Sequence, residues 1–249
     1  MTLPDIVSPE QWRKARVELL VREKEYRRSL DALNADRRRL PMVRVEKDYR
    51  FDGPDGETDL AGLFDGRRQL IMQHVMFDPA WDDACPSCTA AIDELSDGLL
   101  DHVRSRDTTF VLVARAPLAK IVDYRDRKGW TVPWFSSYGS DFNYDFHVTL
   151  DASKAPLEYN YRSDAEWREH GWPDGLGKAG ESSEQPGYSC FLRDGDEVFH
   201  TYSTFGRGTE QLGGGYAFLD MTALGRQEDW EEPKGRADAT RGAVPNFED

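Results

Sequence analysis

The sequence has no long hydrophobic run, and this absence narrows the classes of protein that it can encode. Its longest apolar stretch lies around Leu70–Phe77, far short of the about 20 residues that a membrane-spanning helix needs. Residues 1–5 form neither a basic nor an apolar region, so no secretion signal is visible. We therefore expect a cytoplasmic protein that does not associate with membranes.

Positive charge and cysteine are also scarce. Lys and Arg number 32 against 46 Asp and Glu, which gives a net charge of -14. Like charge repels, so unaided binding to nucleic acid is excluded. Three cysteines are too few, and odd in number, for a disulfide framework. The aromatic content of 12% nevertheless indicates a folded chain with a real core.

The most informative stretch is an apolar run that leads through a short polar loop to two closely spaced cysteines. The run is Leu70–Phe77, and the cysteines stand in Cys85-Pro86-Ser87-Cys88. Beyond them Ile92, Leu95 and Leu99 recur at helical spacing. The sequence thus predicts that a buried strand passes into a helix at the cysteine pair. Free backbone N–H groups and the helix dipole would there lower a thiol pKa from about 8.5 toward neutrality or below.

The chain is predicted to begin with a long helical arm. Ser8 is the expected N-cap, Pro9 the first helical residue and Gln11 its capping-box partner. Ten basic and seven acidic side chains occur within residues 1–41. A basic arm in an acidic chain suggests packing on its own domain or on a second copy, so a homodimer through this helix is one hypothesis. A simply solvated helix face is the other.

Residues 42–232 are predicted to form one α/β domain, with a polar insertion at 151–185 and a polar tail at 233–249. Alternating strands and helices in this order imply parallel strands joined by right-handed crossovers. The elements expected after the arm are strands within 42–51, 69–77 and 108–114, helices at 89–100 and 117–127, a β-hairpin at 188–202, and short C-terminal runs at 216–219 and 224–230.

The stretch 130–147 is dense in aromatic side chains, among them Trp134. Such a stretch can line a groove for an extended peptide or a flat ligand. Equally, it can pack against a sheet. Both readings stay open on the sequence alone.

The order of strand, Cys-x-x-Cys helix, strand, helix and late hairpin is similar to the thioredoxin fold, in which helices flank a central mixed β-sheet. More narrowly, the chain resembles the DUF899 family of thioredoxin-like proteins, described as predicted dithiol–disulfide oxidoreductases. The matching blocks are Asp48–Phe51, Leu63–Leu70, Cys85–Cys88, Ala114–Leu118, Gly129-Trp130, Pro133-Trp134, Ser136-Ser137, Asp141–Asn143, His200–Tyr202 and Gly225–Glu228.

The resemblance implies thiol–disulfide exchange without a cofactor, with a disulfide-containing protein or a low-molecular-weight thiol as partner. Cys85 would be the attacking thiolate and Cys88 the resolving thiol. Trp81 would shield the pair and offer a surface to the partner, together with Pro86 between the cysteines. Another interpretation is that the two cysteines are small side chains that merely cap a helix.

The thioredoxin fold also places a proline opposite the disulfide. By its spacing to the turn glycine Gly195, this position falls at Gly187 or at its neighbour Pro186. We take Pro186, together with Trp134, as further candidate substrate contacts.

Other chemistries of the cysteine pair are also considered. Structural zinc needs four ligands, and a second Cys-x-x-Cys or a close His pair is missing, so no metal site is expected. Thr89 follows the second cysteine where a c-type haem requires His. A copper-binding or delivery protein remains an alternative, with His147 or His74 as a third ligand.

Thiol peroxidase is a further alternative, since peroxiredoxins share the fold. Their activating threonine would stand at position 82, which is Asp82 here. Arg115, just after the second strand, can either hold Cys85 as a thiolate or pair with an acidic neighbour. Cys190, in the predicted hairpin, is interpreted as an inert core residue.

Overall fold

The computed structural model describes residues 4–177, 180–212, 228–230 and 234. This part of the chain divides into two compact units, with a boundary after Pro41. The first contains helix α1 (Pro9–Arg37), and the second contains the β-sheet with its surrounding helices. The run predicted at 216–219 lies outside the described residues, as do most of 224–230 and most of the tail 233–249.

Helix α1 begins as predicted. The Ser8 side chain accepts a hydrogen bond from the backbone N–H of Gln11 at 3.2 Å, and the Gln11 side chain accepts one from the Ser8 N–H at 3.0 Å. Pro9 occupies the first helical position, where its missing N–H costs nothing. This capping box satisfies two backbone donors that the helix itself cannot pair.

The second unit alternates strands and helices. Its helical elements are η1 (Gly62–Phe64), α2 (Pro86–Asp93), α3 (Asp97–Arg104), α4 (Leu118–Lys128), α5 (Phe142–Asp145), α6 (Asp164–Glu169) and η2 (Gly206–Leu212). Its strands are β1 (Val43–Arg44), β2 (Arg50–Gly53), β3 (Gly56–Asp59), β4 (Gln69–His74), β5 (Thr108–Ala114), β6 (Trp134–Ser136), β7 (Thr149–Leu150), β8 (Glu158–Tyr159), β9 (Arg162–Ser163), β10 (Ser183–Glu184), β11 (Gly187–Asp194) and β12 (Glu197–Phe205).

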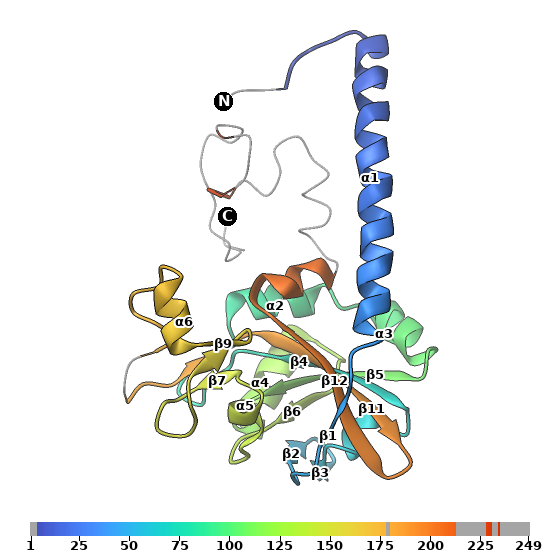
Figure 1. Cartoon of the computed structure of the whole chain (residues 1–249). Coiled ribbons are helices and arrows are strands. Elements are labelled where there is room, and N and C mark those ends of the chain that lie inside the picture. The colour runs from blue at the N-terminus through green and yellow to red at the C-terminus, as the bar shows by residue number, and fades with distance from the viewer. Residues whose placement is uncertain (1–3, 178–179, 213–227, 231–233, 235–249) are drawn as a thin grey trace. The chain divides into compact units, whose positions relative to one another are not determined.

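Within the described residues, the main sheet has eight strands in the order β1-β12-β11-β4-β5-β6-β2-β3. Its centre is parallel, with β4 beside β5 and β5 beside β6. The hairpin of β11 and β12, orange in Figure 1, runs antiparallel along the other side of β4. Because β11 is antiparallel to β4, its first residue, Gly187, pairs with His74 at the carboxyl end of β4. The turn Asp194–Glu197 therefore lies at the opposite end of the sheet.

Residues of the central strands alternate between two cores, as period-two side-chain geometry requires. On one face Leu112 and Ala114 of β5 join a cluster with residues of α2, α3 and α4. On the other face Val111 and Val113 join a cluster with residues of β2, η1 and α5. The sheet is therefore covered on both faces, which explains the nearly continuous apolar sequence of β5.

The prediction of a single helix over 89–100 is wrong in its continuity, because the structure has two helices there. Helix α2 ends at Asp93, and Ser96 caps a new helix by accepting a hydrogen bond from the Leu99 N–H at 3.2 Å. Serine before an acidic residue favours a helix start over a helix interior. The restart exposes Leu99 and buries Leu100 in its place.

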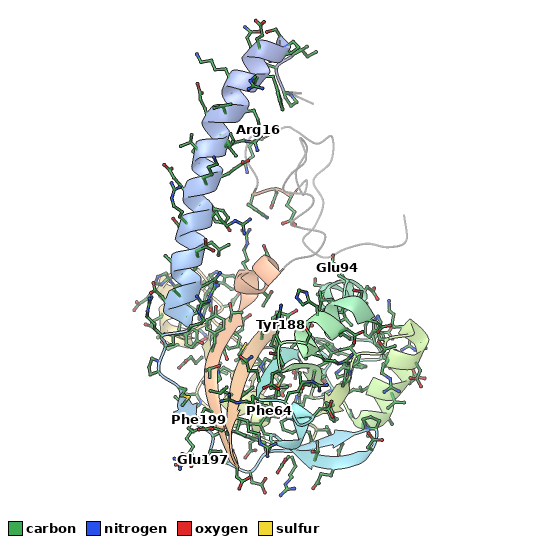
Figure 2. The ribbon with its side chains drawn as sticks, turned by 90° about the vertical axis from the view of Figure 1, so that its right-hand side faces the viewer. Arg16, Phe64, Glu94, Tyr188, Glu197 and Phe199 are labelled. Atoms are coloured by element: carbon green, nitrogen blue, oxygen red, sulfur yellow. The ribbon has the colours of Figure 1, made fainter. Side chains whose placement is uncertain are left out.

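A βαβ unit with the cysteine pair at its first helix, followed by an antiparallel hairpin beside the first strand, is the arrangement of the thioredoxin fold. The predicted fold class is confirmed. Figure 2 shows that Tyr188 lies near one end of the hairpin, whereas Glu197 and Phe199 lie near the other. Among the helices of the described residues, none combines the length and apolar character needed to cross a bilayer.

Candidate functional site

The cysteine pair lies where strand β4 passes into helix α2. Cys85 is the N-cap residue of the helix and Pro86 its first residue. The Cys85 backbone N–H donates to the Met76 carbonyl at 2.9 Å, which folds the intervening loop back onto the end of the strand. The Cys85 side chain is partly exposed, while Cys88, one turn further on, is buried. Both thiols are free.

The two thiols differ sharply in acidity. The Cys88 thiol donates a hydrogen bond to Cys85, and this bond, helped by the N–H groups of Cys88 and Ser87, lowers the pKa of Cys85 to about 5 against the opposing effect of burial. The same hydrogen bond, together with burial, raises the pKa of Cys88 well above that of an ordinary thiol. Near neutral pH the pair therefore holds one accessible thiolate and one buried thiol.

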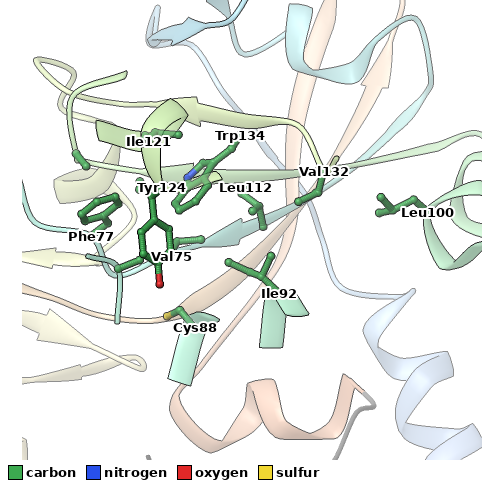
Figure 3. Close-up of a cluster of buried hydrophobic side chains, with 13 residues drawn as sticks. Val75, Phe77, Cys88, Ile92, Leu100, Leu112, Ile121, Tyr124, Val132 and Trp134 are labelled. Carbon is green, nitrogen blue, oxygen red and sulfur yellow. The ribbon is translucent and has the colours of Figure 1, made fainter. Parts of the chain in front are cut away.

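Cys88 is part of the apolar cluster behind the helix. Val75, Ile92 and Tyr124 belong to the same cluster. Figure 3 shows the Tyr124 hydroxyl directed toward α2, beside Cys88. This hydroxyl forms a buried 2.8 Å hydrogen bond with Thr89, the residue after Cys88. Helix α4 is thus tied to the first turn of α2, which fixes the orientation of the dithiol.

Two basic side chains of α4 hold the loop before Cys85. Lys120 donates to the carbonyl oxygens of Pro79 and Trp81, each at 2.8 Å. Arg127 forms an ion pair with Asp83 at 2.6 Å. These contacts fix the backbone of the loop from which the exposed Trp81 side chain projects.

A third basic side chain, Arg115, follows directly after β5. It pairs with Asp78 of the same loop and, at 2.7 Å, with Glu184. Glu184 also accepts a hydrogen bond from Thr149 at 2.8 Å. Burial raises the pKa of Glu184, and Arg115 acts in the opposite direction. The acidic-neighbour interpretation of Arg115 is therefore the one that its contacts support, since Cys85 owes its acidity to Cys88 and Ser87.

The segment before β11 reaches the same end of the sheet. Pro186 lies two residues after Glu184, and its carbonyl accepts a hydrogen bond from the Tyr159 hydroxyl at 3.2 Å. A Cβ atom on Gly187 would lie 2.6 Å from the Phe205 ring, so this position requires glycine. Pro186 itself is partly exposed. Of the two residues considered for the position opposite the dithiol, Pro186 is thus the one with a side chain to offer.

Trp134 does not lie on this surface. It is only 1% exposed and belongs to the apolar cluster that includes Tyr124. Its ring lies 6.1 Å from that of Phe77 and 5.8 Å from that of Trp130. Its selection as a substrate contact is corrected: strand β6 is short and central, so both its faces are covered and Trp134 packs in the core. Trp81, in the loop before Cys85, and Pro86, between the two cysteines, are in contrast exposed.

Histidines do not complete a metal site with the cysteines. Within the described ranges, no three side chains of His, Cys, Asp or Glu come together as metal ligands. His74 points to the sheet face opposite α2, where it forms a 2.8 Å hydrogen bond with Ser189 and stacks on Phe142. Burial lowers the pKa of His74 to about 3. The copper alternative therefore lacks its third ligand in this part of the chain.

Glu184 is the residue that sequence reasoning missed. It lies in a polar stretch that was interpreted as part of an insertion, where one more acidic residue carries no pattern. The only available signal was Pro186-Gly187, which marks the approach to the hairpin. Cys190, predicted to be a core residue, lies on β11 and is partly exposed. Desolvation nevertheless raises its pKa to about 11 and makes it a poor nucleophile at neutral pH.

The sheet order and the dithiol at the start of α2 define a thioredoxin-like protein. The chain belongs to the DUF899 family, described as bacterial proteins of unknown function, whose model matches residues 1–241. No curated protein sequence matches the chain.

Solved structures with a similar chain path include a cysteine mutant of peroxiredoxin Q from Xanthomonas campestris. It has 11% sequence identity and a TM-score of 0.45, with 70% of this chain and 94% of that one covered. A candidate protein disulfide isomerase from Bacteroides thetaiotaomicron has 18% identity and a TM-score of 0.37, covering 70% of this chain and 88% of its own.

Proposed function

We propose that the protein is a thiol–disulfide oxidoreductase that exchanges a Cys85–Cys88 disulfide with a disulfide-containing protein or a low-molecular-weight thiol. The observation that carries this proposal is the placement of the dithiol, with Cys85 partly exposed at the N-cap of α2 and Cys88 buried one turn further on. The opposite shifts of the two thiol pKa values, down for Cys85 and up for Cys88, agree with this placement. An accessible thiolate paired with a buried, protonated thiol is the arrangement that a two-step exchange needs.

In the reducing direction, the Cys85 thiolate attacks one sulfur of the partner disulfide. A bond forms between Cys85 and that sulfur, and the second partner sulfur leaves as a thiolate. Cys88 then gives its proton to solvent, and its thiolate attacks the Cys85 sulfur, which releases the first partner sulfur as a second thiolate. The protein is left with a Cys85–Cys88 disulfide, and the partner has gained two electrons. The reverse sequence oxidises a partner dithiol.

The cytoplasm is the compartment that we propose for this chemistry. There the glutathione and thioredoxin systems keep thiols reduced, so a dithiol can be returned to its active state after each turnover. The lowered pKa of Cys85 keeps its sulfur ionised at neutral pH.

Thiol peroxidase is the second candidate, because the same thiolate can attack a peroxide. The O–O bond would break with release of an alcohol or water, and Cys85 would become a sulfenic acid. Cys88 would then condense with it to give the disulfide and a further water. Two features favour disulfide exchange over this reaction. Asp82 stands three residues before Cys85, where its negative charge would repel a peroxide anion. Arg115 is engaged by two carboxylates, so it offers that anion no free positive charge.

The test is a redox titration of the full chain in glutathione buffers, with alkylation of free thiols and a mass read-out. We expect a reversible disulfide between Cys85 and Cys88, and a trapped mixed disulfide at Cys85 in Cys88→Ser. Cys190→Ser is the matched control, since Cys190 takes no part in the exchange and its loss should leave the titration unchanged.

Two results would overturn the proposal. One is a pair of thiols that stays reduced at every glutathione ratio. The other is a Cys85 that forms sulfenic acid with hydrogen peroxide far faster than it reacts with any disulfide, which would make the protein a thiol peroxidase.

A further inference from the structure

A buried ion cluster lies at the carboxyl ends of β4 and β5. Its centre is Arg115, whose side chain is 15% exposed, between Asp78 at 15% and Glu184 at 1%. Burying three charges is costly unless each is fully paired. The cluster lies outside the dithiol itself, and the exchange mechanism described above does not use it.

We propose that Arg115 is a positioning residue that sets the spacing between the two exposed sides of the dithiol site, the Trp81 side and the Pro186 side. This inference rests on the proposed disulfide exchange and deepens it. It also gives the site a substrate class: a folded or extended polypeptide that carries a disulfide and touches both sides, rather than a small disulfide that touches only Cys85.

Toward Trp81 the connection is short. One terminal nitrogen of Arg115 binds one oxygen of the Asp78 carboxylate. The other carboxylate oxygen accepts a hydrogen bond from the Ala80 N–H at 2.8 Å, and the Asp78 carbonyl accepts one from the Trp81 N–H at 3.0 Å. Asp78 thus organises the turn that presents Trp81, and Arg115 holds Asp78 in place.

Toward Pro186 the connection is equally direct. The Nε atom of Arg115 donates to Glu184 at 2.7 Å. Strand β10, which contains Glu184, pairs with β7, and the next residue, Gln185, donates its N–H to Val148 at 2.8 Å. Pro186 follows at once and precedes Gly187, which pairs with His74 at the end of β4. The position of Pro186 therefore depends on where Glu184 is held.

The shape and the charge of the Arg115 guanidinium both suit it to this role. A guanidinium presents its donors in a rigid planar fork, so it fixes two carboxylates in one geometry, which a lysine cannot do. Without it, Asp78 and Glu184 would face each other as two like charges in a water-poor setting and would separate. Arg115 does not act on the Cys85 thiolate directly, because Cys88 and Ser87 account for the acidity of Cys85.

The experiment compares two substrates on each variant, with dithiothreitol as the electron donor. One substrate is insulin, whose disulfides lie in a polypeptide; the other is glutathione disulfide. In Arg115→Met we expect the KM for insulin to rise about tenfold, because misplaced contacts weaken binding. The rate constant with glutathione disulfide and the pH dependence of Cys85 alkylation should stay within about twofold of the wild type.

The matched control is Arg67→Met. Arg67 is a partly buried arginine at the amino ends of β4 and β5, where it pairs with Asp65 at 2.6 Å. Its loss should leave both substrates unaffected. Glu184→Gln is a milder second variant, in which we expect a smaller rise of the insulin KM and the same insensitivity to glutathione disulfide. Circular dichroism establishes which variants are folded. If Arg115→Met is unfolded, Glu184→Gln alone tests the positioning role.

The outcomes separate this inference from the proposed function. An unchanged insulin KM in folded Arg115→Met and Glu184→Gln overturns the positioning role, as does an equal loss with both substrates. A wild-type protein that reduces neither substrate overturns the oxidoreductase proposal itself. A selective loss with insulin supports both.

Discussion

The two ends of the central strands β4 and β5 handle charge in opposite ways. At their amino ends Arg67 pairs with Asp65, and the Asp65 side chain is 76% exposed. At their carboxyl ends Arg115 pairs with Asp78 and with Glu184, whose side chain is 1% exposed. Exposed pairs contribute little to stability, whereas buried ones are costly to assemble and very costly to break. The costly buried ions therefore lie at the carboxyl ends of the strands, the same end of the sheet that holds the dithiol.

The two ends of the sheet should differ most in how much their arginines contribute to stability. Arg115→Met should lower the free energy of unfolding by about 3–5 kcal/mol, because it leaves two buried carboxylates without their cation. Arg67→Met should cost about 0–1 kcal/mol, because water solvates what remains of that pair. Urea unfolding followed by circular dichroism measures both. Equal losses at the two ends would show that the buried cluster is no more than another ion pair.

The negative charge of the Cys85 thiolate should be set within the dithiol and not by the ion cluster beside it. Cys88→Ala removes the hydrogen bond that chiefly holds the pKa of Cys85 at about 5. The Cys85 pKa should then rise toward the ordinary thiol value of about 8.5. Cys88→Ser keeps a donor at the same place, so its rise should be smaller.

The measurement is the rate of Cys85 alkylation by iodoacetamide between pH 4 and 9. Arg115→Met is the control, because the ion cluster should not influence the pH dependence of Cys85 alkylation. A Cys85 pKa that moves as far in Arg115→Met as in Cys88→Ala would assign the thiolate to the cluster instead.

The parts of the fold that follow a simple period were predictable from sequence. Strand β5 is found at Thr108–Ala114, as its β-branched residues indicated, and the capping box at Ser8 begins α1. The start of α2 at the cysteine pair also follows, because an apolar run, a loop and Pro86 leave few other arrangements. Local signals of this kind depend on neighbours in the sequence, which is why they can be read without the structure.

The features that were missed depend on contacts between distant residues. Glu184 lies 69 residues from Arg115 along the chain, and nothing in its own neighbourhood shows that it will be buried. Trp134 belongs to an aromatic stretch, but only the strand order shows that β6 is covered on both faces. The break between α2 and α3 was present in the sequence at Ser96, where a capping residue stands inside an apolar period.

The smallest expected effect concerns the pH dependence of the buried cluster. Burial raises the pKa of Glu184 above its ordinary value of 4.5, so the folded protein holds this proton more tightly than the unfolded chain. The contribution of the carboxyl to stability is therefore full below pH 4.5 and is lost as the pH rises through the raised folded pKa.

Glu184→Gln removes this titration while keeping the size of the side chain. The free energy of unfolding of the wild type, relative to that of the variant, should fall as the pH rises from 4 to 7. Urea unfolding at a series of pH values gives the difference, and Asp65→Asn, which makes the same change of charge at the amino end, corrects for the net charge of the protein. A difference that grows with pH would mean that Arg115 stabilises the Glu184 carboxylate by more than burial disfavours it, and the two ends of the sheet would then differ in exposure but not in the cost of their charges.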